Sequence, residues 1–70
     1  MWFVTRVFFK GGQQSNSIQM FTDELAARKR FYTILATDID SKDIEFELIQ
    51  IVREDGVCIA SMPIDNRAEA

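Results

Sequence analysis

The chain has 70 residues, which is the size of one small domain and leaves no room for a second. Eight basic and eleven acidic residues give a net charge of −3, which argues against general nucleic-acid binding because such binding needs a basic surface. One cysteine and no histidine exclude an internal disulfide, the usual zinc sites and a histidine-based catalytic set. We therefore expect no metal, no cofactor and no enzymatic activity.

The first segment, Trp2–Lys10, is rich in aromatic and β-branched residues and predicts a strand. Both faces of this strand are largely apolar, which is typical of a position in the middle of a sheet. Gly11-Gly12 suits the positive φ angles of a two-residue hairpin turn. The return segment, Gln13–Phe21, predicts an edge strand, although its polar first half could equally form a loop.

Residues 22–36 predict the only helix. Thr22 is a plausible N-cap, and Asp23 and Glu24 occupy the first turn, where the helix dipole favours negative charge. The helical period then gives one apolar stripe, with a second row of apolar residues beside it. The stripe contains Leu25, Arg28, Tyr32, Leu35 and Ile39, and the second row contains Ala27, Phe31, Ile34 and Leu35. We expect a wide side of the helix to face the sheet, with Arg28 at its border.

A second hairpin follows the helix. Ile44–Arg53 predicts a strong strand, and Asp55-Gly56 is a strong hairpin signal. The return strand runs from Val57 to Met62, and Pro63 is expected to end it as an edge strand. We predict a single domain over residues 1–64 and a disordered tail over residues 65–70.

The layout is β-β-α-β-β, an α+β fold with a four-stranded antiparallel sheet of order 2-1-3-4 and one helix on one face. One helix leaves the other face of the sheet open, and soluble monomers rarely expose an apolar patch of that extent. We therefore expect a homodimer or higher oligomer. The residues assigned to its interface are Trp2, Val4, Phe8, Ile49 and Ile51, and the alternative to the first three is their counterparts on the other face of the strand.

Two basic features are candidates for an anionic or nucleotide-like ligand. Arg6 lies among aromatic residues, where a guanidinium can pair with a phosphate or stack on a base. The alternative is that its stem packs on the aromatics while its head reaches Glu45 or Glu47. The run Arg28, Lys29 and Arg30 forms the second candidate, with a solvated helix surface as the alternative.

The spacing of Glu45 and Glu47 offers a third candidate. Two positions apart on one strand face, the two carboxylates would raise each other's pKa and could act as an acid/base pair. The alternative is the ordinary solvent side of a strand.

Several stretches form a recognisable pattern: an aromatic-rich first strand, an acidic helix start, an aromatic-x-x-x-Leu-Ala helix and a hairpin rich in β-branched residues. They are Trp2 to Phe9, Asp23-Glu24, Phe31 to Ala36, and Ile44 to Val57 with its turn at Gly56. In this pattern the chain resembles small uncharacterised proteins of phages and prophages. It departs from them by two extra residues between Glu24 and Phe31 and by Tyr32, where a histidine is common.

The resemblance implies an accessory protein in the cytoplasm of a host cell. We expect a non-enzymatic oligomeric binder that inhibits a host factor, such as a host defence component, or sequesters a small nucleotide-like ligand. A structural component of a virion or other assembly is one alternative, and a small nucleic-acid-binding regulator is another. The resemblance supplies no active site, and we expect no contact with a membrane.

Overall fold

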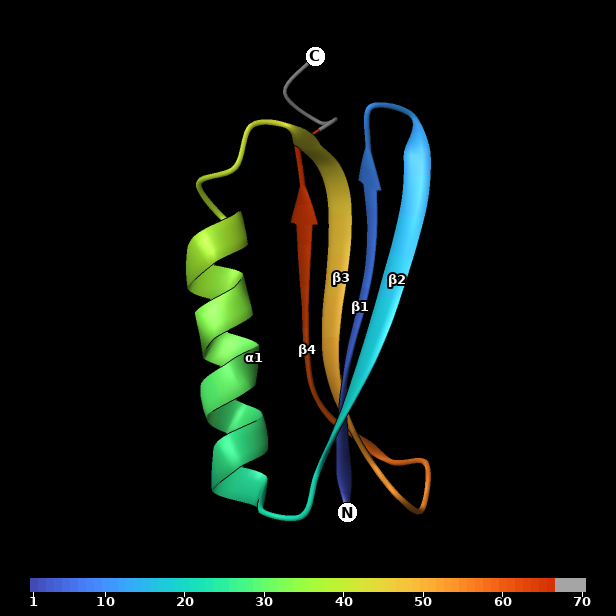
Figure 1. Ribbon diagram of the computed structural model, residues 1–70, viewed down its shortest axis with the longest axis vertical. Helices are drawn as coiled ribbons and strands as arrows, with labels where there is room; N and C mark the ends of the chain where they lie inside the picture. The colour runs from blue at the N-terminus through green and yellow to red at the C-terminus, as the bar shows by residue number, and fades with distance from the viewer. Residues whose placement is uncertain (67–70) are drawn as a thin grey trace.

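The computed structural model of the protein describes residues 1–66. Its elements are β1 (Trp2–Lys10), β2 (Gln13–Phe21), α1 (Glu24–Asp38), β3 (Ile44–Arg53) and β4 (Cys58–Asp65). The strands pair antiparallel in the order β2-β1-β3-β4, and α1 runs along the sheet (Figure 1). The predicted α+β class, the β-β-α-β-β layout and the strand order 2-1-3-4 are confirmed.

The first hairpin closes through Gly11 and Gly12, whose φ angles of 60° and 79° are both positive. Two consecutive positive φ angles are typical of a type I′ turn, which glycine adopts without steric cost. The turn sets a register that runs without interruption from Lys10 opposite Gln13 to Trp2 opposite Phe21. The polar first half of β2 is therefore part of the strand and does not form a loop.

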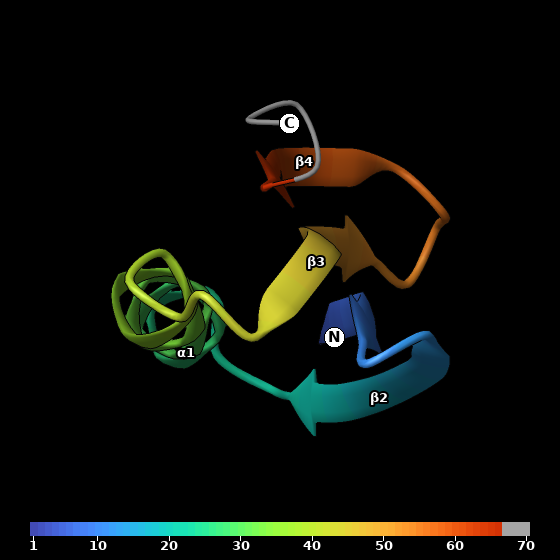
Figure 2. The ribbon, with the colours of Figure 1, turned by 90° about the horizontal axis from the view of Figure 1, so that it is seen from above.

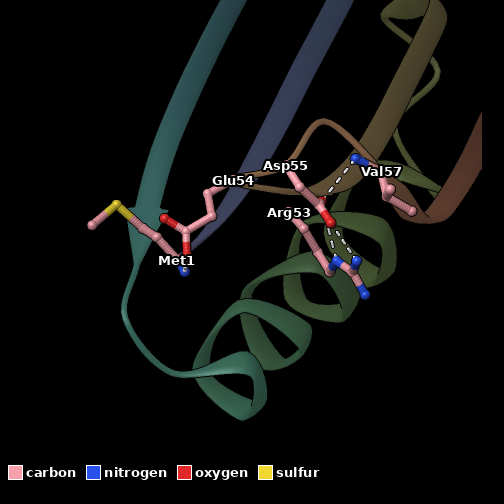
Figure 3. Close-up of polar contacts among 5 residues, drawn as sticks. All are labelled: Met1, Arg53, Glu54, Asp55 and Val57. Atoms are coloured by element: carbon pink, nitrogen blue, oxygen red, sulfur yellow. Dashed lines mark hydrogen bonds and ion pairs between the residues drawn. The ribbon is translucent and has the colours of Figure 1, made fainter.

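The turn of the second hairpin also holds the N-terminus (Figure 3). The N–H of Gly56, at a φ of 90°, donates a 2.9 Å hydrogen bond to the carbonyl of Arg53. The guanidinium of Arg53 and the backbone N–H of the residue after Gly56 both donate to the carboxylate of Asp55, and they lower its pKa to about 2. The amine of Met1 donates a 3.0 Å hydrogen bond to Glu54, which ties the first residue to the same turn.

Helix α1 is displaced by two residues from the predicted range. Asp23 has the extended φ and ψ angles of an N-cap, and no side chain caps the helix start, so the prediction of Thr22 as N-cap is wrong. The last helical residue is Asp38, two residues beyond the predicted end at residue 36.

Helix α1 buries the second of its two predicted apolar rows against the sheet. The buried residues of α1 are Ala27, Phe31, Ile34 and Asp38, which follow one another at helical spacing. The exposed fractions of Leu25 and Tyr32 are 59% and 56%. The predicted stripe through these two residues is therefore wrong, and the second row carries the core.

Strand β4 continues through Pro63 to Asp65, so the proline does not end the strand. Asn66 then donates from its side chain to the carbonyl of Ile44 at 2.7 Å and from its backbone N–H to the carbonyl of Glu45 at 3.0 Å. The ordered fold thus reaches two residues beyond the predicted boundary at residue 64. The other four residues of the predicted tail lie outside the described residues.

The helix covers the face of the sheet that the sequence had assigned to oligomer contacts. Val4 is 2% exposed, and Ile49 and Ile51 are fully buried in one cluster with Phe31 and Ile34 of α1. The alternation of β1 puts the other two predicted interface residues, Trp2 and Phe8, on this same face. The assignment of Trp2, Val4, Phe8, Ile49 and Ile51 to the open face is therefore wrong.

Candidate functional site

The face of the sheet turned away from α1 is the most extended candidate surface. No described element covers it (Figure 2). Its members follow from the pairing register, since they alternate with the buried residues of the core. We call this set the open sheet face: Phe3, Thr5, Val7, Phe9, Gln14, Asn16, Ile18, Met20, Phe46, Leu48, Gln50, Val52, Ser61, Pro63 and Asp65.

The open sheet face is mainly apolar, and its one charged side chain, Asp65, lies at the end of β4 opposite Phe46. Ile18 and Met20 on β2 are 70% and 63% exposed. Phe9 and Phe46, opposite each other on β1 and β3, have ring centroids 6.5 Å apart. Such a continuous, mainly apolar surface resembles the interior of a protein interface more than a solvated sheet.

A second candidate lies beneath α1, where Arg6 contacts two carboxylates. Its Nε donates to Oε2 of Glu47 at 2.6 Å, and its Nη2 donates to Oδ2 of Asp38 at 2.7 Å. Its guanidinium carbon lies 4.5 Å from the centre of the Phe8 ring, a cation–π contact. We call Arg6, Asp38 and Glu47 the buried ion cluster. The prediction that Arg6 reaches Glu45 or Glu47 is confirmed by the bond to Glu47.

The carboxyl group of Glu47 has no exposed surface, and its Oε1 has no hydrogen-bond partner among the described residues. Burial and the nearby carboxyl of Asp38 raise the pKa of Glu47 to about 7, against the opposing hydrogen bond and charge of Arg6. Burial alone would lower the pKa of Arg6, but its bonds to the two carboxylates raise it. Glu47 is therefore the member of the cluster whose pKa lies near neutral pH.

Glu45 and Glu47 do not form the predicted acid/base pair. The carboxylate of Glu45 instead accepts a 3.0 Å hydrogen bond from the N–H of Gly12 in the first turn. Asp38, on the other side of the buried ion cluster, is the carboxylate that acts on Glu47. The sequence interpretation missed Asp38, although its helical spacing from Phe31 and Ile34 places it on the buried side of α1.

Of the four residues predicted to bind an anionic ligand, the fold brings together only Arg6 and Arg30. Arg28 pairs with Glu24 at 3.0 Å one helical turn away, and Lys29 is exposed. Arg30 donates to Oε1 of Gln19 on β2 at 2.7 Å. Arg6 and Arg30 line the same shallow cavity of about 120 Å³, but the two carboxylates already neutralise Arg6.

A larger hollow of about 450 Å³ lies beside the connection between α1 and β3. Its lining residues are Ile39, Asp40, Ser41, Lys42 and Asn66. None of the predicted ligand-binding residues is among them. Within residues 1–66 we find no group of side chains with the composition of a metal site.

The fold and these surfaces define a small α+β protein with an uncovered sheet face. The chain matches no protein-family model, no curated protein and no solved structure. In the part of the chain that the structure describes, no helix has the length and apolar character needed to span a membrane.

Proposed function

We propose that the protein is a small non-enzymatic binding protein that acts as a homodimer or higher oligomer joined through its open sheet face. The observation that carries the proposal is the mainly apolar character of that face, on which Asp65 is the single charged residue, combined with exposed Ile18 and Met20. An isologous dimer places one patch against its own copy, so the patch must be apolar or self-complementary in charge. A mainly apolar face whose single charge lies at the end of an edge strand meets this requirement.

The size of the face also supports the proposal. Four strands spaced about 4.8 Å apart, each about nine residues long, give a flat area of about 550 Å². The accessible area of a corrugated side-chain layer exceeds its flat area. It therefore approaches the ~800 Å² that each partner contributes to a standard stable interface.

The buried ion cluster does not support an enzymatic alternative. Its carboxylates and guanidinium bond to one another, and it includes no hydroxyl, thiol or amine nucleophile. A structural role, in which Arg6 joins the end of α1 to the sheet, accounts for the contacts observed.

The proposed targets follow from the resemblance to phage and prophage proteins. Under this proposal the dimer inhibits a host factor or sequesters a small nucleotide-like ligand in the cytoplasm of the host cell. The binding surface for that target is distinct from the dimer contact.

A structural component of a virion or other assembly is a second candidate. It is favoured by a second apolar surface along α1 and its C-cap, where Leu25, Tyr32 and Ile39 are each more than half exposed. Assemblies larger than a dimer need two contact surfaces on each subunit. Stoichiometric presence in purified particles would support this candidate over the first.

The test of the dimer is the molar mass of the purified protein by light scattering, with Leu48→Lys as the variant. Leu48 lies on the central strand β3, and a buried unpaired lysine at an interface is strongly unfavourable. We expect the wild type to be dimeric and Leu48→Lys to be monomeric with an unchanged circular dichroism spectrum. Ala36→Lys adds the same charge at an exposed position of α1 and should remain dimeric. A monomeric wild type would overturn the proposal.

A further inference from the structure

The two edges of the sheet differ in how they are protected against a further strand. At β4, Pro63 lacks an N–H, and the register shifts between Ile51 and Val52 of the neighbouring strand. Proline and irregular pairing are the usual devices that block an edge. Strand β2 has neither: its nine residues pair regularly with β1, and none of them is proline or charged.

The outward backbone groups of β2 follow from the turn that precedes it. A two-residue type I′ turn makes Lys10 and Gln13 a hydrogen-bonded pair, and such pairs alternate along an antiparallel ladder. Odd-numbered residues of β2 therefore bond to β1. The N–H and carbonyl groups of the even-numbered residues point away from the sheet, and these residues are Gln14, Asn16, Ile18 and Met20.

The side chains along this edge indicate what kind of strand would fit. On the open sheet face, Ile18 and Met20 are exposed next to the position that a fifth strand would occupy. On the other face, Arg30 lies against Gln19, a neutral residue, and has no ion-pair partner among residues 1–66. A strand added here would place apolar side chains on one side and meet an uncompensated guanidinium on the other.

We propose that the edge of β2 accepts an extended segment of a partner protein as a fifth strand. The segment alternates apolar side chains, which pack beside Ile18 and Met20, with polar ones that include a carboxylate near Arg30. This inference deepens the proposed binding function, because it assigns the target to an extended protein segment. In Figure 2, β2 forms the rim of the sheet, and no described element lies beyond it.

A second copy of the chain fits this edge less well than such a segment. Its own β2 contains no charged residue, so it has no carboxylate to place opposite Arg30. Its first half also contains only glutamine, serine and asparagine, which offer no apolar group to Ile18 or Met20. The charge and the apolar pattern therefore favour a different protein.

The test uses three synthetic ten-residue peptides in which valine alternates with glutamate, serine or lysine. Binding is followed through the backbone amide resonances of the intact isotope-labelled protein. We expect the valine–glutamate peptide to bind several-fold more tightly than the valine–serine peptide and the valine–lysine peptide to bind least. The amide signals of Asn16, Ile18 and Met20 should shift most, because their N–H groups would bond to the peptide.

Two variants distinguish the edge from other surfaces. Asn16→Pro removes one outward N–H and should abolish binding, whereas Asn16→Thr keeps that N–H and should retain it. Arg30→Ala should remove the preference for glutamate over serine. The proposal would be overturned if none of the peptides bound, if Asn16→Pro bound as well as the wild type, or if the edge paired only with a second copy.

The peptide-binding experiment and the dimer experiment test different surfaces, so one can fail without the other. Leu48→Lys changes the open sheet face at β3 and leaves the backbone of β2 unaltered. Peptide binding by monomeric Leu48→Lys would support strand addition at β2 and show that it does not require the dimer. A dimer that binds no peptide would leave the proposed interface standing and overturn the strand addition alone.

Discussion

Arg6 donates a 2.6 Å hydrogen bond from Nε to Oε2 of Glu47, a carboxylate with no exposed surface. The same guanidinium reaches Asp38 at the C-terminal end of α1. A carboxylate at that end of a helix is unfavourable beside the negative pole of the helix dipole. Arg6 offsets this cost, and it joins β1, β3 and the end of α1 at one point.

Replacement of Arg6 by methionine should unfold much of the protein at neutral pH. It would leave two acidic groups close together with no counter-charge, and removal of one partner from a buried ion pair costs about 3–5 kcal/mol. A domain of this size has roughly 3–5 kcal/mol of stability from its core. Urea denaturation followed by circular dichroism measures the loss. The double variant Arg6→Met with Glu47→Leu should recover most of it, and no recovery would contradict this explanation.

The stability of the protein should fall as pH rises from about 4.5 to about 7. The pKa of Glu47 is raised from 4.5 to about 7 in the folded state, so folding favours its protonated form. Its contribution is fully present below the unfolded pKa and is lost as pH rises through the folded pKa. A shift of this size corresponds to roughly 3 kcal/mol.

The matched variant for this pH dependence is Glu47→Gln, which has the shape of the protonated acid and does not titrate. Its free energy of unfolding should lack the decline between pH 4.5 and pH 7 and should exceed that of the wild type at pH 7. The measurement is a set of urea denaturations across this range. Parallel curves for the two proteins would contradict the assignment to Glu47.

The sequence predicted the sheet better than it predicted the helix. The Gly11-Gly12 pair, the aromatic run of β1 and the Asp55-Gly56 turn carry local information about strands and turns. The strand order followed from which strands were apolar on both faces. The face covered by α1 could not be derived in the same way. Strand β1 is apolar on both faces, so its alternation does not indicate which of them meets the helix.

The buried side of the helix was equally hard to predict from the sequence. Apolar residues occur on several sides of α1, and the row through Leu25 and Tyr32 competes with the row through Phe31 and Ile34. Only the position of α1 over Ile49 and Ile51 decides between them. The open sheet face was therefore expected from the layout, but its residues could not be assigned from periodicity alone.

Alanine substitutions at Phe31 and Tyr32 should differ in their cost to the free energy of unfolding, because only Phe31 belongs to the buried row of α1. Phe31 is 3% exposed within the core, and loss of such a side chain costs about 3–5 kcal/mol. Tyr32 is mostly exposed and contacts the Phe31 ring edge-on at 5.2 Å, so its loss should cost about 0.5–1.5 kcal/mol. Thermal and urea denaturation of both variants measure the difference. Equal losses would contradict the observed orientation of α1.

Replacement of Pro63 by threonine should give the sheet a second edge that can pair with another strand. Proline has no N–H, so in an edge strand its nitrogen lies on the side turned away from the neighbouring strand. Threonine at this position would place a free N–H on that outer side of β4. The fold should be retained, since the pairing of Pro63 with Leu48 does not use that group. We expect Pro63→Thr to aggregate faster than the wild type in light-scattering measurements. A variant with threonine at exposed Ser61 provides the control, because its N–H is already present. Unchanged aggregation of Pro63→Thr would show that the proline does not protect this edge.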